Sequence, residues 1–111
     1  MQLLEAVKYD KGKDRYDLYP PEALEQQVRV LTEGAKKYAD RNWESGLSYS
    51  RVFAAAMRHM WNWFNPLKSD YDDETGINHL AHAACCIVFI LTFEQRNMKE
   101  FDDRPSPRKS S

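Results

Sequence analysis

The sequence predicts a small all-α domain, an antiparallel bundle of about three main helices that oligomerisation completes. Three stretches place apolar residues three and four positions apart, which is the spacing of one helix face. Proline, glycine and asparagine separate these stretches, and we find no alternation of apolar and polar residues typical of a half-buried strand. With 111 residues, the chain is expected to form one domain over residues 1–98, followed by a disordered polar tail over residues 99–111.

The first helix is predicted over about residues 21–38. Residues 1–19 precede it as an irregular, ligand-accessible segment, in which charges of both signs surround Gly12. Pro20 ends any extended chain, and Pro21 suits the first helical position because proline has no N–H to leave unpaired there. Apolar side chains then recur at helical spacing, at Leu24, Val28, Leu31 and Ala35.

The second and third helices are expected on either side of an acidic loop. Ser48 or Ser50 is predicted to cap an alanine-rich helix that ends at Asn65, because Pro66 follows it. The loop carries the acidic run of residues 70–74. Thr75 is then predicted as the N-cap of a third helix that continues to about Gln95.

The third helix also predicts a partner. Residues 83–91 read AACCIVFIL, so this helix should be buried nearly all round. Two other helices cannot cover it, so we expect a homo-oligomer, either a dimer or a tetramer. The run is too short to span a membrane, and the N-terminus lacks the apolar region of a signal peptide. Cys85 and Cys86 are interpreted as small buried thiols.

The overall charge excludes one class of function. The formal net charge is −1 and the isoelectric point is near 6.3, which argues against a strongly electrostatic nucleic-acid binder. Together with the absence of a membrane span, this predicts a cytoplasmic protein whose partners are neither nucleic acid nor membrane.

The three histidines are the best candidates for a site. His79 and His82 stand three apart on the third helix, so their rings project from the same side one turn apart. Neutral imidazole binds transition metals and shuttles protons near neutral pH. With His59 across from the preceding helix and Glu74 just before the third, the pattern predicts a metal site of four ligands: His59, Glu74, His79 and His82. The alternative is a network of core histidines that pair with the acidic loop.

Basic and aromatic residues suggest a nucleotide. Lysines and arginines around a glycine can hold phosphate oxygens, and aromatic side chains can stack on a base. Arg58 lies in an alanine- and tryptophan-rich helix, where a lone guanidinium would be costly, so it should pair with an acid or a phosphate. Ordinary surface charge and core packing are the competing interpretations. The predicted substrate-binding residues are Lys13, Arg15, Lys37, Tyr38, Asn42, Trp43 and Arg58.

Six segments of the chain together resemble a known family. They read DKGKDRYDLYP at residues 10–20, GAKKY at 34–38, RNW at 41–43, RH at 58–59, ETG at 74–76 and HLAHA at 79–83. They closely resemble the N-terminal domain of dATP/dGTP diphosphohydrolases, a family of small proteins common in phages and prophages. The resemblance covers about residues 8–95.

The resemblance implies a fold like that of the all-α NTP pyrophosphohydrolases. In longer proteins of the family, this domain precedes a MazG-like nucleotide pyrophosphohydrolase domain. That enzyme class is oligomeric, depends on magnesium or manganese, and uses EExxE followed by ExxD on two antiparallel helices. The present chain lacks this pair of motifs: the region in the place of ExxD reads HLAH, and the preceding helix offers RH in place of a glutamate cluster.

The expected function is therefore metal-assisted hydrolysis of a (deoxy)nucleoside triphosphate to the monophosphate and pyrophosphate, in the cytoplasm of a host cell. The predicted catalytic residues are Glu74, His79 and His82, with Mg²⁺ or Mn²⁺ favoured as the cofactor and Zn²⁺ as an alternative. A non-catalytic module that sequesters a nucleotide or regulates a partner enzyme is the second hypothesis. A purely structural phage protein is the third.

Overall fold

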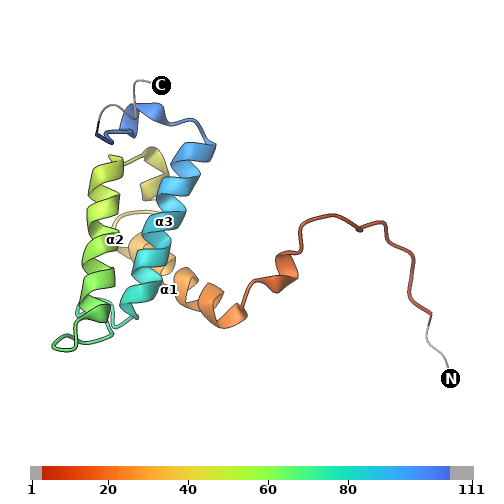
Figure 1. Ribbon diagram of the computed structural model, residues 1–111, viewed down its shortest axis with the longest axis horizontal. Coiled ribbons are helices and arrows are strands. Elements are labelled where there is room, and N and C mark those ends of the chain that lie inside the picture. Colours follow the sequence, from red (N-terminus) through yellow and green to blue (C-terminus); the bar gives the residue numbers. More distant parts are fainter. Residues whose placement is uncertain (1–3, 106–111) are drawn as a thin grey trace.

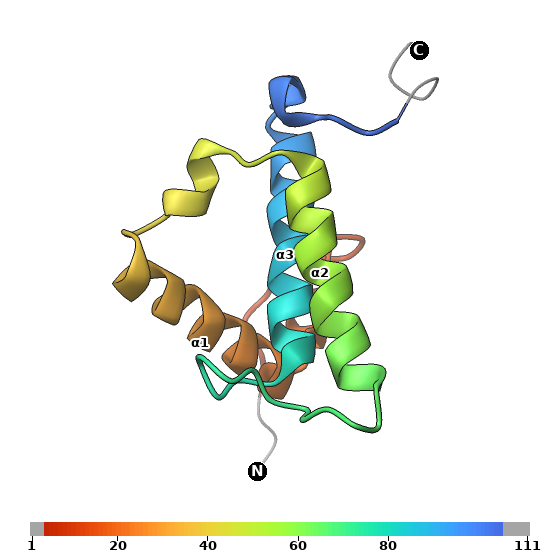
Figure 2. The same ribbon diagram turned by 90° about the vertical axis from the view of Figure 1, so that its left-hand side faces the viewer.

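The computed structural model describes residues 4–105 and confirms the all-α prediction. Its helices are α1 (Pro21–Lys37), α2 (Tyr49–Phe64) and α3 (His79–Gln95), and residues 4–105 contain no β-strand, only one isolated bridge. Helices α2 and α3 lie side by side and run antiparallel, whereas α1 crosses them at an angle and packs on α3 (Figures 1 and 2).

The start of α1 agrees with the prediction, but the start of α3 does not. Pro21 occupies the first turn of α1. Helix α3 begins only at His79, where the side-chain oxygen of Asn78 accepts a hydrogen bond of 2.8 Å from Leu80 N–H. The prediction of Thr75 as N-cap is therefore wrong. Its hydroxyl accepts from Ile77 N–H within a tight turn, and Gly76 with φ = 72° keeps the chain out of the helix there.

The core lies at the end of the α2–α3 pair that is remote from the acidic loop. Its fully buried centre is Phe93, which contacts Tyr49 and Val52 of α2. The ring of Trp43, from the short 3₁₀ helix Asn42–Ser45, stacks on Phe89 with 4.2 Å between ring centroids. This packing closes one end of the helix pair.

The predicted polar tail begins later than the sequence suggests. A 3₁₀ helix spans Lys99–Phe101, and the half-buried Phe101 packs against the core. Asp103 then accepts a hydrogen bond of 2.8 Å from Ser50 N–H in the first turn of α2. Phe101 and Asp103 thus hold residues 99–105 against the helices. The polar composition of this segment did not predict these two contacts. The rest of the predicted tail, residues 106–111, lies outside the described residues.

Helix α3 is less buried than predicted. Its sides toward α1 and α2 are covered, but Ile87 and Leu91 remain 59% and 52% exposed in the single chain. Cys85 is buried as expected, and burial raises the pKa of its thiol to about 11, so it stays protonated. No helix among the described residues is long and apolar enough to cross a membrane.

The N-terminal segment extends away from the helices as an arm (Figure 1). We call residues 4–19 the arm. Every residue in it is exposed, and its only helical element is the 3₁₀ turn Tyr16–Leu18. Gln27 of α1 donates a side-chain hydrogen bond to the hydroxyl of Tyr19, which fixes the base of the arm.

Candidate active site

The antiparallel pairing of α2 and α3 brings the three histidines together. His59 lies in the second half of α2, opposite the first turn of α3, which carries His79 and His82. The Nδ1 atoms of His59 and His79 are 2.9 Å apart. The ring of His82 stacks on that of His59, with 4.6 Å between centroids and 11° between planes. The predicted convergence of histidines across the two helices is therefore present in the structure.

The acidic loop contributes Asp72 to this cluster. The loop folds back on itself because Asp72 N–H donates to Ile77 O at 2.9 Å and His79 N–H donates to Asp70 O at 2.8 Å. The Asp72 carboxylate also accepts from the backbone N–H of Thr75 at 2.9 Å. These bonds hold the carboxylate at the entrance to α3, next to the histidine rings.

His59, Asp72 and His79 form a donor set that suits a metal ion. One ligand atom from each lies within 4.8 Å of the others. Two ligands at right angles, each about 2.0–2.1 Å from an ion, are about 2.9 Å apart, which matches the separation of the two Nδ1 atoms. A hydrogen bond joins these two nitrogens in the structure, and an ion would take the place of its proton. Two imidazoles and one carboxylate favour Mn²⁺, Fe²⁺ or Zn²⁺ over Mg²⁺.

The protonation states fit this role. Burial, followed by the charges of His82 and His79, lowers the pKa of His59 to about 4, so this ring is neutral at neutral pH. Burial opposes ionisation of Asp72, but hydrogen bonds from the Thr75 backbone and hydroxyl, together with His82, outweigh it and hold the pKa below its ordinary value. A neutral imidazole and an ionised carboxylate are the forms that bind a metal.

Thr75 determines which nitrogen of His82 carries the proton. The Thr75 hydroxyl lies 3.0 Å from Asp72 Oδ2 and 2.7 Å from His82 Nε2. Because the carboxylate only accepts, the hydroxyl must donate to Asp72, and His82 Nε2–H must then donate to the hydroxyl. The opposite arrangement would leave two oxygen lone pairs facing each other at 3.0 Å. His82 Nδ1 is therefore the basic nitrogen of this ring.

Glu74, the carboxylate predicted to bind the metal, lies elsewhere. Its Oε1 accepts a hydrogen bond of 2.8 Å from Lys37 Nζ, and this contact raises the pKa of Lys37. The Glu74 side chain is largely exposed. The structure thus places Glu74 in a bridge between the acidic loop and α1, while Asp72 is the carboxylate beside His59 and His79.

A groove of about 1500 Å³ opens beside this cluster, between α1, the segment after it and the α2–α3 pair. His59, Asp72 and His82 lie along its wall, whereas His79 is buried behind them. The predicted substrate-binding residues that line it are Lys37, Tyr38, Asn42, Trp43 and Arg58. Trp43 serves the core at the same time, through its stacking on Phe89.

The four arginines that line the groove differ in whether they already form an ion pair within the described residues. Arg41 and Arg96 both contact the carboxylate of Glu44, at 3.6 and 2.8 Å. Arg51 and Arg58 line the groove two helical turns apart on α2, and neither forms an ion pair within residues 4–105. Arg51 was not among the predicted residues, although its spacing of seven from Arg58 on one helix indicates a shared face.

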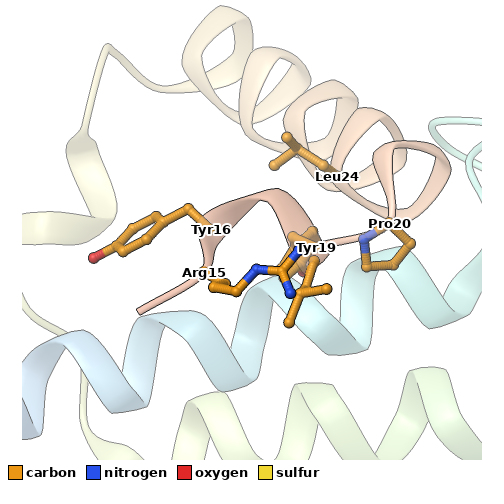
Figure 3. Close-up of a pocket in the computed structure, with 6 residues that line it drawn as sticks. Arg15, Tyr16, Tyr19, Pro20 and Leu24 are labelled. Atoms are coloured by element: carbon orange, nitrogen blue, oxygen red, sulfur yellow. The ribbon is translucent and has the colours of Figure 1, made fainter. Parts of the chain in front are cut away.

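Two predicted residues, Lys13 and Arg15, lie on the arm and do not line the groove. Arg15 donates to the carboxylate of Asp17 at 2.8 Å. Arg15 instead lines a separate, shallow hollow of about 670 Å³ at the base of the arm (Figure 3). The other lining residues are Tyr16, Leu18, Tyr19, Pro20 and Leu24.

Comparison with known proteins confirms the resemblance seen in the sequence. The chain is 39% identical over 98 residues to a protein of Salmonella phage PMBT28 named dATP/dGTP diphosphohydrolase. The match covers 88% of this chain but 32% of the relative, so the chain spans about a third of that protein's length. No solved structure matches. The family described as dATP/dGTP diphosphohydrolase, N-terminal, matches residues 5–104, and the chain belongs to this family.

Proposed function

We propose that this chain binds a (deoxy)nucleoside triphosphate in the groove and hydrolyses it to the monophosphate and pyrophosphate with the help of a divalent metal ion. The observation that carries the proposal is the position of the donor set of His59, Asp72 and His79 beside a groove whose wall includes two arginines that form no ion pair within residues 4–105. The name of the phage relative agrees with a nucleotide substrate.

The arginines support a phosphate ligand. Arg58 was expected to pair with an acid or a phosphate because a lone guanidinium inside an apolar helix would be costly, but the residue is exposed at the groove wall, where water solvates it. No carboxylate among residues 4–105 forms an ion pair with it, so it is available to a phosphate. Arg51 is likewise exposed at the groove wall about two turns away, and Ala55 lies between the two arginines. A run of two guanidinium groups with a small residue between them suits a chain of phosphates, because each phosphate oxygen needs a nearby donor.

Different residues of the chain bind the metal, accept the proton and neutralise the phosphate charge. An ion held by His59, Asp72 and His79 would lower the pKa of a bound water and polarise a phosphoryl oxygen. His82 Nδ1 accepts the proton of the water that attacks the α-phosphorus. The bond from this phosphorus to the bridging oxygen breaks, and pyrophosphate leaves. Arg51 and Arg58 neutralise the charge that develops on the phosphate oxygens.

Turnover of a nucleotide panel tests the proposal. We expect the purified chain, with Mn²⁺ or Zn²⁺, to convert at least one deoxynucleoside triphosphate to its monophosphate and pyrophosphate, resolved by ion-exchange chromatography. His59→Gln should abolish turnover, and Arg58→Gln should reduce kcat/KM by about 10²-fold or more. Arg29→Gln is the matched control, because Arg29 lies on α1 and bonds only Gln26 within the described residues.

The second candidate is a non-catalytic nucleotide-binding module. It is favoured by the absence of the motif pair of the MazG-like enzymes, EExxE followed by ExxD. Calorimetric binding of a nucleotide without any release of pyrophosphate, over the same metal panel, would support this candidate and contradict hydrolysis. A chain that neither binds nor hydrolyses any nucleotide of the panel would contradict both candidate functions.

A further inference from the structure

Helix α2 carries a stripe of large apolar side chains that the described part of the chain, residues 4–105, leaves exposed. Its members follow each other at intervals of four, three and four residues: Phe53, Met57, Met60 and Phe64. They are between 41% and 69% exposed. This spacing keeps them on one side of the helix over three turns.

Helix α3 carries a second stripe with the same spacing. Leu80, Ala84, Ile87 and Leu91 again follow each other at intervals of four, three and four residues. Ile87 and Leu91 are the most exposed residues of the stripe, at 59% and 52%. No charged residue occupies any of the eight positions in the two stripes.

The two stripes lie on the same face of the α2–α3 pair. On each helix, the stripe residues follow buried residues by one position: Phe53 follows Val52, Met57 follows Ala56, and Ala84 follows Ala83. One position along a helix is a rotation of about 100° about its axis. Because α2 and α3 run antiparallel (Figures 1 and 2), the same rotation on both helices brings the two stripes to the same side of the pair. Helix α1 and the groove are on the other side, where Cys85 contacts the carbonyl of Gln27.

We propose that this apolar face is the docking site for a second copy of the chain, related by a two-fold axis, so that two α2–α3 pairs form a four-helix bundle. The seven large side chains of the stripes are about half exposed on average, so together they expose on the order of 700 Å², since each presents roughly 150–250 Å² when fully exposed. That area approaches what each partner buries in a standard interface, about 800 Å², and exceeds the roughly 300–600 Å² patch of a typical monomer.

The stripes themselves indicate why the occupant is another copy. A face without charge meets its own copy without repulsion, as a two-fold interface requires. Intervals of four and three are those of helices that interlock with other helices of similar length. Since the groove faces the other way, pairing leaves both grooves open to ligand.

Sedimentation of the full chain tests the proposal. We expect the wild-type chain to be a dimer at about 100 µM and to dissociate on dilution with a measurable Kd. Phe53→Ala and Ile87→Ala should each raise this Kd by about tenfold or more, because each removes apolar surface from the interface. Val28→Ala, on the half-exposed side of α1, should leave it unchanged. Alanine favours helix, so circular dichroism should show unaltered helix content.

Two results would overturn the proposal. One is a wild-type chain that remains monomeric at about 100 µM, which would leave the face to a different domain or protein. The other is a wild-type dimer whose Kd is unaffected by both Phe53→Ala and Ile87→Ala, which would place the interface elsewhere. Because neither Phe53 nor Ile87 lines the groove, nucleotide hydrolysis by these two variants is measured independently of this test.

Discussion

At the scale of single residues, His59 makes stability depend on pH. Its pKa is about 4 in the folded chain, mainly through burial, against an ordinary value of 6.5. The unfolded chain therefore binds the proton more readily, and stability is full above about pH 6.5 and falls as the pH approaches 4. Since the ring is only partly buried, we expect a loss of about 1–2 kcal/mol between pH 7.5 and pH 4.5.

Urea unfolding at the two pH values measures this loss. His59→Gln provides the control, because it removes the titrating ring while keeping a polar side chain. The variant should show a flatter dependence on pH than the wild type over this interval. Equal slopes for both proteins would contradict the assignment, since the other titrating groups of the cluster would then account for the whole effect.

Thr75 provides a second prediction at this scale. Its hydroxyl fixes the Nε2–H form of His82 by donating to Asp72 and accepting from the ring. Thr75→Ser keeps the hydroxyl and should preserve that form, whereas Thr75→Val should release the ring into a mixture of both forms. The ¹⁵N chemical shifts of the His82 ring, measured at one fixed neutral pH without metal, distinguish the two. Identical shifts in the serine and valine variants would contradict the assignment.

At the scale of elements, Gly46 is where the segment before α2 meets the C-terminal 3₁₀ helix. A Cβ there would overlap the ring of Phe101, and φ is 109°, so any other residue is strained as well. We expect Gly46→Ala to lower the free energy of unfolding by about 2–3 kcal/mol. Gly12→Ala is the matched control: φ is 83°, but nothing lies within 4 Å, and the arm does not pack on the core. Chemical unfolding should show that Gly12→Ala lowers the free energy of unfolding by at most about 1 kcal/mol.

The helices could be predicted because their signals are local. Pro21 and the apolar spacing determine α1, and the pairing of His59 with the first turn of α3 follows from a short connection between two helices. Which carboxylate joins the histidines could not be predicted in this way. Asp72 and Glu74 are two residues apart, and only the turn at Gly76 places the first beside the rings and directs the second to Lys37.

The groove was only partly predictable, because it depends on how three elements pack. The sequence identified Arg58 as needing a partner, but the residue is exposed at the groove wall, so water solvates its guanidinium and the protein need not supply one. Arg51 carried the same information in its spacing from Arg58, but that signal identifies a helix face and says nothing about what the face meets. Trp43 could be assigned to core packing or to the groove, and the structure gives it both positions.

At the scale of the whole molecule, metal binding should raise the thermal stability of the folded chain. A divalent ion that binds the folded cluster and not the unfolded chain raises the melting temperature by mass action. We expect Mn²⁺ or Zn²⁺ at about 100 times its Kd to add about 2.7 kcal/mol, which is several degrees for a chain of this size. Differential scanning fluorimetry of the wild type and of Asp72→Asn measures this. A wild type that gains nothing from either ion would contradict the metal site.

The attachment of α1 to α3 has a consequence for motion within the native chain. Helix α1 carries no fully buried residue, whereas α2 and α3 enclose the core between them. Local opening should therefore release α1 while the α2–α3 pair stays folded, and amide hydrogens of α1 should exchange with solvent much faster than those of α3. Because α1 forms one wall of the groove, every such opening widens it. A nucleotide held between the walls would then slow exchange in α1 more than in any other helix.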